Sequence, residues 1–354
     1  METVGTRCRL RKSPISMLHN GTLAEKIGNI CTLFIGIAVS LLLNGCTEQK
    51  PRLYRMGILC GLDVFTSTID GFKAGMTEAG YVEGKNITYD VHSTNFDSTA
   101  EEHILRKFVA DKVDAMLVFP SEVSVAAKHV TEGTGVPVVF CQTNIEGTDL
   151  IENVTEPGGN LTGVRYPGPD LAIKRFEILH ELAPRARRIW VPYSTKVLIV
   201  TDQLKALRPV ARRAGVTLVE APADSAEDLL ADLEKREKAP DIGIDAVLLI
   251  SEPLARTPPV FVKIGKFAAD HRIPIGGVLY SLEGYSTVFG VATDNIAVGK
   301  QAARHAHKVL SGIPAGTIPV VSAESYFQLN HTVAQALGLS VPEGLLKQAD
   351  EVIR

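Results

Sequence analysis

The stretch Ala115-Met116-Leu117-Val118-Phe119-Pro120-Ser121 decides the fold class of this chain. Its first five residues are apolar without interruption, which is typical of a strand buried on both faces of a parallel sheet. A helical pattern begins at Ser121, and a second apolar run covers residues 136–141. A strand, a helix and another strand in this order predict a parallel unit with a right-handed crossover.

The same alternation extends in both directions from this stretch. Toward the N-terminus we expect strands at residues 53–60 and 86–91, followed by helices that begin at the capping boxes Ser67–Asp70 and Ser98–Glu101. A second series begins near Arg188. Its expected strands cover residues 189–192, 216–219, 246–250, 273–277 and 287–291, and its helices cover residues 202–214, 225–237 and 258–270.

Two such series predict an α/β fold with two doubly wound parallel-sheet lobes. A last helix at residues 294–310 and two short strands at 318–321 and 326–329 complete both lobes. We expect the N-terminal lobe to contain residues 53–166 and 292–322. The C-terminal lobe then contains residues 167–291 and 323–354.

The composition supports a packed globular protein. The chain has 354 residues, of which 45% are hydrophobic and 22% charged, and its formal net charge is −3. Because no basic surplus is present, nucleic acid is a poor candidate partner. Five cysteines do not suggest a disulfide scaffold, and we expect Cys60 and Cys141 to be free and buried.

The first 45 residues differ from the rest. They carry a local charge of +3, and no charged residue occurs between Lys26 and Glu48. A basic region followed by an apolar stretch and small residues is the order of an export signal. The sequence Leu43-Asn44-Gly45-Cys46 resembles the lipobox of bacterial lipoproteins, in which the cysteine is lipidated and becomes the mature N-terminus.

We therefore expect a signal peptide at residues 1–45, lipidation at Cys46 and a tether at residues 46–52. These features place the protein in a bacterial cell envelope, anchored by lipid on the extracytoplasmic side of a membrane. The alternative is a transmembrane helix that is never cleaved, because the uncharged span is almost long enough to cross a bilayer. Met17 is an alternative start of the chain.

In open parallel sheets, ligands bind at the carboxyl ends of the strands, where loops and helix N-termini converge. Two such sheets that face each other form a cleft between the lobes. The residues that directly follow the expected strands are the candidate ligand-binding residues. They are Asp63, Phe65, Pro120, Ser121, Gln142, Thr143, Asn144, Tyr193, Ser194, Ser251, Glu252, Tyr280, Glu283 and Asp294.

Their chemistry suggests different roles. Ser121 is expected to cap its helix, whose free N–H groups also suit a carboxylate. Carboxylates at Glu252, Glu283 and Asp294 suit an ammonium group, although Asp294 also has the position of an N-cap. The aromatic rings of Phe65, Tyr193 and Tyr280 suit the apolar part of a ligand. The polar residues Thr143 and Asn144 either contact the ligand or form a turn.

No catalytic motif is present in the sequence. It contains no Gly-x-Ser-x-Gly elbow, no His-Glu-x-x-His pair and no phosphate-binding loop. His305 and His307 are two residues apart on an expected helix, so they diverge and are poor joint metal ligands, and both are expected at the surface. We therefore expect neither an enzyme nor a cofactor.

Several motifs together resemble the ABC-transporter substrate-binding lipoproteins that include tryptophan- and tyrosine-binding members. The resemblance covers the chain from Leu53 to Pro342. It implies a type I periplasmic-binding-protein fold, with two lobes that are joined by three crossovers and close over a small ligand. The motifs are Gly71-Phe72-Lys73-Ala74-Gly75-Met76, Gly80-Tyr81-Val82-Glu83-Gly84-Lys85-Asn86, Val109-Ala110-Asp111-Lys112-Val113-Asp114, Pro157-Gly158-Gly159-Asn160-Leu161-Thr162-Gly163-Val164 and Ala336-Leu337-Gly338-Leu339-Ser340-Val341-Pro342.

Two departures from these relatives concern the ligand. Thr143-Asn144-Ile145 stands where relatives commonly have an acidic pair, and Gly290-Val291-Ala292-Thr293-Asp294 stands where they often have Gly-Val-Asp-Tyr-Tyr-Asp. Two aromatic positions suited to stacking on a ring are therefore missing. This difference argues against an aromatic amino acid as the ligand.

The resulting hypothesis is a monomeric solute receptor that captures a small molecule, first an amino acid, and delivers it to an ABC permease. The alternative is a ligand-sensing receptor for a membrane signalling partner. An enzyme is disfavoured because no catalytic motif is present. A cytoplasmic repressor is disfavoured because the N-terminus carries a lipobox in place of a DNA-binding helical head.

Overall fold

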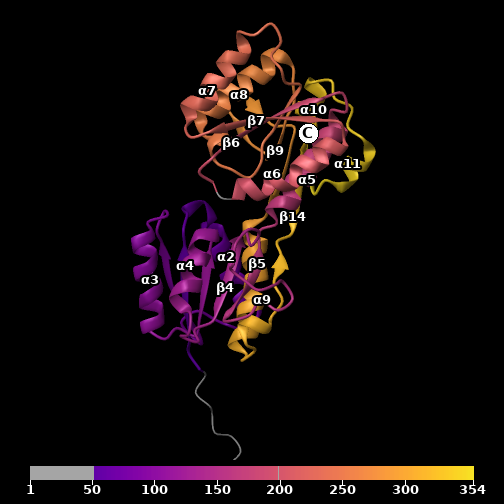
Figure 1. Ribbon diagram of the computed structural model, residues 1–354. Helices are drawn as coiled ribbons and strands as arrows, with labels where there is room; N and C mark the ends of the chain where they lie inside the picture. Colours follow the sequence, from indigo (N-terminus) through magenta and orange to yellow (C-terminus); the bar gives the residue numbers. More distant parts are fainter. Residues whose placement is uncertain (1–51, 198) are drawn as a thin grey trace, which may run out of the picture. The chain divides into compact units, whose positions relative to one another are not determined.

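The computed structural model describes residues 52–197 and 199–354, and residues 53–354 form one compact unit (Figure 1). The expected signal peptide, the lipidation site Cys46 and all of the tether except Arg52 lie outside the described residues. None of the helices in the described part combines the length and the apolar character that a membrane crossing needs.

The first sheet contains six strands, all parallel to their neighbours. In order across the sheet they are β13 (Val321–Ser322), β5 (Leu161–Arg165), β4 (Val138–Thr143), β3 (Ala115–Phe119), β1 (Tyr54–Cys60) and β2 (Ile87–Ser93). Alternate residues of β1 point to opposite faces, so Ile58 packs with one helix pair and Leu59 with the other. The first pair is α2 (Thr66–Glu78) and α9 (Asn295–Leu310), and the second is α3 (Ser98–Ala110) and α4 (Ser121–Thr131).

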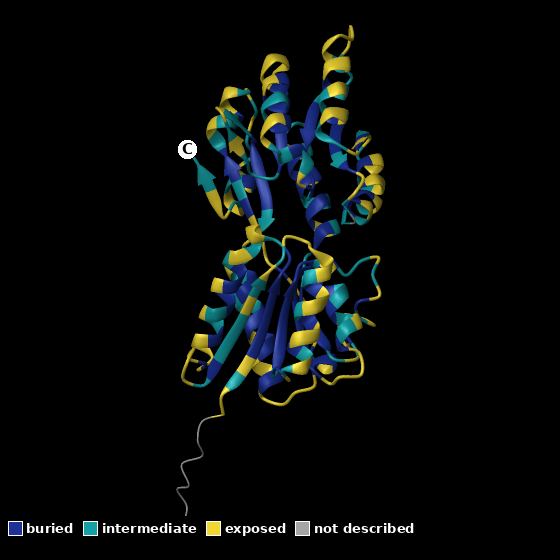
Figure 2. Ribbon diagram, turned by 90° about the vertical axis from the view of Figure 1, so that its left-hand side faces the viewer, coloured by how far each residue is buried: buried dark blue, intermediate teal, exposed yellow. Residues whose placement is uncertain are grey.

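The second sheet contains seven strands. In order they are β15 (Glu351–Ile353), β14 (Ser325–Asn330), β12 (Phe289–Thr293), β9 (Ile275–Gly277), β8 (Ala246–Leu248), β6 (Arg188–Ser194) and β7 (Thr217–Ala223). Helices α5 (Gly168–Leu182) and α6 (Ile199–Arg213) pack on one face, and α7 (Ala226–Glu237) and α8 (Pro258–His271) on the other. Burial of the strands between these helices is visible in Figure 2.

Two strands of the second sheet, β14 and β15, run opposite to the other five and so depart from the expected parallel arrangement. β14 pairs antiparallel with β12. The chain leaves β12 at its carboxyl end and enters the first sheet through α9 and β13. It returns at the same end of the second sheet, so β14 must run in the opposite direction. The short helices α10 (His331–Ala336) and α11 (Glu343–Gln348) then lead to β15.

The two sheets share one strand order. β2-β1-β3-β4-β5 in the first sheet corresponds to β7-β6-β8-β9-β12 in the second. In each sheet the order reverses once, between β1 and β3 and between β6 and β8. A reversal of this kind opens a crevice at the carboxyl ends of the strands, which is where doubly wound sheets bind ligands. The chain passes between the sheets at residues 166–167, 294 and 323–324.

The expected elements agree with the structure in most places, and the differences have local causes. The interval 115–119 is β3, and Cys60 and Cys141 are free and buried as expected. Both predicted capping boxes in the first lobe are wrong. Helix α2 begins at Thr66 without a side-chain cap, and the carboxylate of Asp97 caps α3 by accepting from two backbone N–H groups. Neither β5 nor α5 was expected.

The surface position expected for His305 is also wrong. Only 4% of its surface is exposed, and its two ring nitrogens lie 3.1 Å from the carbonyl oxygens of Gln301 and Pro319. Burial lowers the pKa of His305 because it disfavours the imidazolium. His307 is exposed, as expected.

Helices α2 and α9 pack unusually closely, and Figure 1 shows them beside each other in the first lobe. A Cβ atom at Gly71 would lie 2.1 Å from the carbonyl oxygen of Ile296, and one at Gly299 would lie 2.1 Å from that of Thr68. Only glycine allows this approach of two backbones. The contact places the first turn of α9 next to the loop that follows β1.

Candidate functional site

In the first sheet, Asp63 and Phe65 lie in η1 (Asp63–Phe65), a 3-10 helix that directly follows β1. The Asp63 side chain is exposed and accepts a hydrogen bond of 2.6 Å from the Ser93 hydroxyl. Phe65 is half-buried and packs against the core. Asp63 is therefore accessible to a solute at the carboxyl end of the sheet, whereas part of Phe65 belongs to the core.

The expected N-cap role of Ser121 is wrong, because Pro120 occupies the N-cap position of α4. The Ser121 hydroxyl instead accepts a hydrogen bond of 2.9 Å from the backbone N–H of Asn144. The β4 ladder ends at Thr143, so this N–H has no strand partner. The structure thus brings two candidate residues together at the ends of neighbouring strands.

Thr143 is fully buried at the end of β4, where its hydroxyl bonds to the Ser124 hydroxyl at 2.7 Å and to the Cys141 carbonyl at 2.7 Å. It is therefore a strand residue and not a turn former. Asn144 donates to the Glu146 carbonyl at 3.0 Å and to the Asp202 carboxylate of α6 at 3.4 Å. Its side-chain oxygen is buried and accepts no hydrogen bond from the described residues.

The side chains of Gln142 and Asn295 connect the end of β4 to the first turn of α9. The Gln142 side-chain amide donates to the Asn295 side-chain oxygen at 2.7 Å. Asn295 in turn donates to the Val64 carbonyl and the Ser67 hydroxyl, both at 3.3 Å. Next to it, Asp294 is exposed and caps α9 by accepting from the Ala297 N–H at 2.6 Å, as its expected N-cap position requires.

In the second sheet, Glu252 and Ser194 meet at the strand-order reversal between β6 and β8. Glu252 is 3% exposed, and its carboxylate accepts from the backbone N–H groups of Ser194 at 3.2 Å and of Leu254 and Ala255 at 2.8 Å each. The last two belong to the 3-10 helix η2 (Leu254–Arg256). Burial raises the pKa of Glu252, although these three bonds oppose the shift.

A cavity of about 220 Å³ opens beside this point, between the end of β6 and the first turns of α6. Two candidate residues, Tyr193 and Ser194, are part of its wall. The Tyr193 hydroxyl bonds to Glu220 at 3.3 Å, and Glu220 pairs with Arg208 at 2.8 Å, so the polar rim is fixed. The full lining is Tyr193, Ser194, Thr195, Val197, Val200, Thr201, Leu204 and Arg208.

Tyr280 and Glu283 belong to a separate hairpin formed by β10 (Ser281–Leu282) and β11 (Tyr285–Ser286). The Tyr280 ring packs edge-on against Phe261 with centroids 4.6 Å apart. Glu283 is exposed at the turn with a φ of 50°. Within the described residues, no hydrogen bond joins either side chain to the other candidates.

The binding candidates predicted from the sequence did not include Arg175, Tyr166 or Gln203, which surround the candidate Ser251. Arg175 of α5 donates to the Ser251 hydroxyl at 2.6 Å, and this hydroxyl bonds to the Tyr166 hydroxyl at 2.6 Å. The Gln203 side-chain amide holds the backbone of Ser251 through bonds of 3.1 and 2.9 Å. A signal existed in the sequence, because Leu171, Arg175 and Leu179 recur every fourth residue and place a charge within an apolar stripe.

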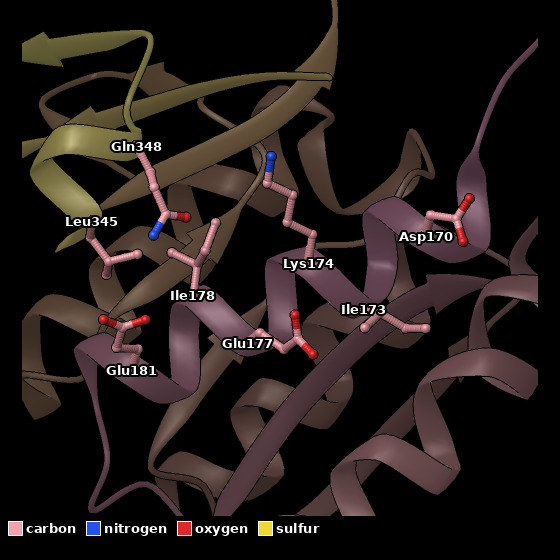
Figure 3. Close-up of a pocket in the computed structure, with 8 residues that line it drawn as sticks. All are labelled: Asp170, Ile173, Lys174, Glu177, Ile178, Glu181, Leu345 and Gln348. Carbon is pink, nitrogen blue, oxygen red and sulfur yellow. The ribbon is translucent and has the colours of Figure 1, made fainter. Parts of the chain in front are cut away.

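A larger surface groove of about 440 Å³ lies elsewhere, between α5 and α11 (Figure 3). It contains none of the strand-end candidates, and its side chains carry both signs of charge on the outer face of α5. We do not assign the solute site to it. The residues that line it are Asp170, Ile173, Lys174, Glu177, Ile178, Glu181, Leu345 and Gln348.

Comparison with solved structures supports the fold assignment. An L-Trp complex of an ABC domain from Streptococcus pneumonia matches with a TM-score of 0.69 and 21% identity, over 85% of this chain and all of that one. The ligand-free, open structure of a Clostridium difficile substrate binding protein matches with a TM-score of 0.70 and 21% identity, over 85% and 99%. The chain therefore has the type I periplasmic-binding-protein fold.

Sequence comparison identifies the family. Residues 60–353 match the family model described as ABC transporter substrate binding protein. A curated relative, the tyrosine-binding protein of Clostridioides difficile (strain R20291), is 26% identical over 278 residues, which is 76% of each chain. The chain belongs to the ABC transporter substrate-binding protein family.

Proposed function

We propose that this chain is the extracytoplasmic solute receptor of an ABC importer and captures an amino acid between its two lobes. The observation that carries the proposal is the family match together with polar strand ends at the order reversals of both sheets. One relative is named for tyrosine and another was solved with L-Trp. No chemical step on the solute is part of this proposal.

The lobe boundaries are part of the same proposal. One lobe consists of residues 53–166 and 294–322, and the other of residues 167–293 and 323–354, because β12 of the second sheet extends to Thr293, two residues beyond the boundary expected from the sequence. Closure is a hinge motion, and the solute favours the closed state by contacting both lobes. Affinity then depends on groups from each side. Asp63 suits an ammonium group from the first lobe, and Tyr193 and Ser194 contribute from the second.

The end of β12 favours a solute without a large aromatic ring. Ala292 and Thr293 are half-buried there and offer no ring for stacking. A polar or aliphatic amino acid therefore fits these positions better than tryptophan or tyrosine does.

A thermal-shift screen of the purified protein tests this function. Amino acids, small carboxylates, amides, nucleosides and sugars are compared at equal concentration. A ligand at about 100 times its dissociation constant stabilises the fold by roughly 2.7 kcal/mol. We expect a reproducible shift from amino acids. A shift from sugars or nucleosides alone would replace the amino-acid assignment and retain the receptor.

Two variants test whether both lobes hold the solute. Asp63→Ala in the first lobe and Tyr193→Phe in the second are each expected to reduce the ligand-induced shift. Asp70→Ala is the matched control, since Asp70 is an exposed aspartate of α2. Loss of the shift in only one of the two variants would contradict capture between the lobes.

Uptake separates transport from sensing. We expect deletion of the gene to abolish uptake of the radiolabelled solute identified in the screen. Normal uptake combined with loss of a transcriptional response to the solute would instead favour the ligand-sensing receptor.

We also propose that Cys46 is lipidated after removal of residues 1–45. The wild-type protein is expected to incorporate labelled palmitate and to sediment with membranes, and Cys46→Ser is expected to do neither. Cys31→Ser is the matched control because Cys31 lies in the proposed signal. Labelling of Cys46→Ser would refute the assignment.

A further inference from the structure

Arg175 is a buried cation without a carboxylate partner. Only 1% of the residue is exposed, and it forms no ion pair with a carboxylate of the described residues. Its Nε and Nη2 donate to the Val291 carbonyl at 2.8 and 2.5 Å, and its Nη1 donates to the Ser251 hydroxyl. A buried charge that only neutral groups compensate carries a substantial desolvation cost.

The protons in this cluster can be counted. A guanidinium only donates, so the Ser251 oxygen accepts from Arg175. The bond between the Ser251 and Tyr166 hydroxyls uses one of their two protons, whichever group donates it. The other hydroxyl proton remains available outside the cluster. Ser251 and Tyr166 are both half-buried, so this donor is close to solvent.

The cluster lies near the carboxyl end of the second sheet, in the region proposed for the solute, and its residues are not part of the wall of the 220 Å³ cavity. Ser251 follows β8 at the order reversal of the second sheet, and Gln203 fixes its backbone. Tyr166 lies where the chain passes between the sheets, and its backbone N–H bonds to the Thr143 carbonyl of β4 at 2.7 Å. The hydroxyl pair is therefore anchored to both lobes.

A second cation reinforces the local charge. Arg256 donates to the Glu252 carbonyl at 3.1 and 3.2 Å and forms no ion pair with the described residues. Burial is the main reason that the pKa of Arg175 is lowered, and repulsion from Arg256 adds to this effect while Tyr166 opposes it. The nearby Glu252 carboxylate is already engaged by three N–H groups.

We propose that Ser251 and Tyr166 bind a carboxylate group of the solute and that Arg175 supplies its counter-charge through them. The inference rests on the proposed receptor function and narrows its ligand to compounds with a carboxylate. A free hydroxyl donor backed by a fixed cation suits a charged acceptor better than a neutral one. Arg175 is a positioning residue in this arrangement, since Ser251 separates it from the solute.

The test measures dissociation constants by calorimetry for pairs of L-amino acids and their C-terminal amides, with myo-inositol as a neutral compound. The wild-type protein is expected to bind the acid at least about tenfold more tightly than its amide, a difference of about 1.4 kcal/mol. Tyr166→Phe is expected to weaken binding of the acid by about tenfold and to reduce the preference for the acid. Tyr89→Phe is the matched control, because the Tyr89 hydroxyl is buried without a hydrogen-bond partner in the described structure.

Two further variants separate charge from folding. Arg175→Lys keeps the charge and is expected to retain part of the preference for the acid, and Arg175→Met is expected to lose it. Melting temperatures without solute show whether each variant folds. If Arg175→Met does not fold, Ser251→Ala replaces it and is expected to reduce the same preference.

The outcomes distinguish this inference from the receptor function. Equal affinity for an acid and its amide, or an unchanged preference in Tyr166→Phe, would overturn the carboxylate site and leave the receptor intact. If myo-inositol binds and no acid does, the carboxylate site is likewise overturned and the receptor function is retained. If no compound binds, the carboxylate inference and the amino-acid assignment both fail.

Discussion

Replacing Glu252 by alanine tests whether this buried carboxylate holds the second lobe together or remains available to a solute. Its two oxygens accept from three backbone N–H groups, those of Ser194, Leu254 and Ala255. These bonds connect the end of β6 to η2. In Glu252→Ala all three donors lose their partner inside the protein.

The cost follows from these contacts. A buried donor left unsatisfied costs about 1 to 3 kcal/mol, so three such donors imply a loss of roughly 3 kcal/mol or more. A loss of this size lowers the melting temperature of a chain this long by roughly 4 °C or more. Glu252→Gln keeps one acceptor oxygen, so we expect a smaller loss.

The pH dependence has a defined sign. Burial raises the pKa of Glu252 above its ordinary value of 4.5, so the folded protein binds this proton more tightly than the unfolded chain. Its contribution to stability is therefore fully present below pH 4.5 and declines as pH rises through the raised pKa. The difference in stability between the wild type and Glu252→Gln should be larger at pH 4 than at pH 7.

Urea unfolding followed by tryptophan fluorescence measures these effects. Trp190 is the single tryptophan, and it is buried in β6 of the same lobe. Glu234→Ala is the control, because Glu234 is exposed on α7, and it should unfold like the wild type. An ordinary surface substitution changes the free energy of unfolding by about 0.5 kcal/mol or less. If Glu252→Ala changes it by no more than this, the structural role of Glu252 is refuted.

Three further predictions concern the first lobe. Gly299→Ala should lower the free energy of unfolding by about 1 to 3 kcal/mol, because its Cβ would lie 2.1 Å from the Thr68 carbonyl oxygen. Gly344→Ala is the control and should be neutral or slightly stabilising, because no atom lies within 4 Å of its Cβ. Urea unfolding midpoints of the two variants test this difference. The lowered pKa of His305 means that stability falls as pH drops below about 6.5, and His305→Leu should reduce this loss between pH 7 and 5, as measured by thermal unfolding. Ser121→Ala should cost about 1 kcal/mol by leaving the Asn144 N–H without its acceptor, and equal urea midpoints for this variant and the wild type would contradict that role.

The architecture was predictable where a local pattern determines it. Uninterrupted apolar runs such as residues 115–119 mark buried parallel strands, and their alternation with helices gave the two-lobe fold. The elements that were missed have weak local signals. β5 has five residues, as β3 does, but Thr162 and Gly163 interrupt its apolar run, and α5 begins at Gly168-Pro169 without a side-chain cap. Arg175 interrupts its apolar stripe.

Helix caps were predicted less well because several polar residues compete for the same N–H groups. At α3, Ser98 fits the sequence pattern of a capping box, but Asp97 lies one residue earlier and its carboxylate accepts from two N–H groups. A charged acceptor forms the stronger bonds. At α7, where no cap was predicted from the sequence, Ser225 and Asp228 form a complete capping box.

The expectation that ligands bind at the carboxyl ends of strands selected polar residues at those ends. It could not show which of these residues already form hydrogen bonds within the protein. Ser121 and Glu252 both follow strands, yet each accepts hydrogen bonds from backbone N–H groups elsewhere in the lobe. Such partners are set by loop geometry and not by spacing along the chain. The Arg175 bond to Val291 joins residues 116 positions apart, which no local pattern reveals.

Two classes of polar residue therefore share the carboxyl ends of the strands. Groups such as Thr143 and Glu252 are saturated within the protein, so they stabilise the shape of the site and offer little to a solute. The Ser251–Tyr166 hydroxyl pair and the Asn144 side-chain oxygen retain unused hydrogen-bonding capacity among the described residues. Because a solute gains affinity mainly from groups that have no partner before it binds, these few unsaturated positions should determine specificity, while the saturated ones fix where those positions lie.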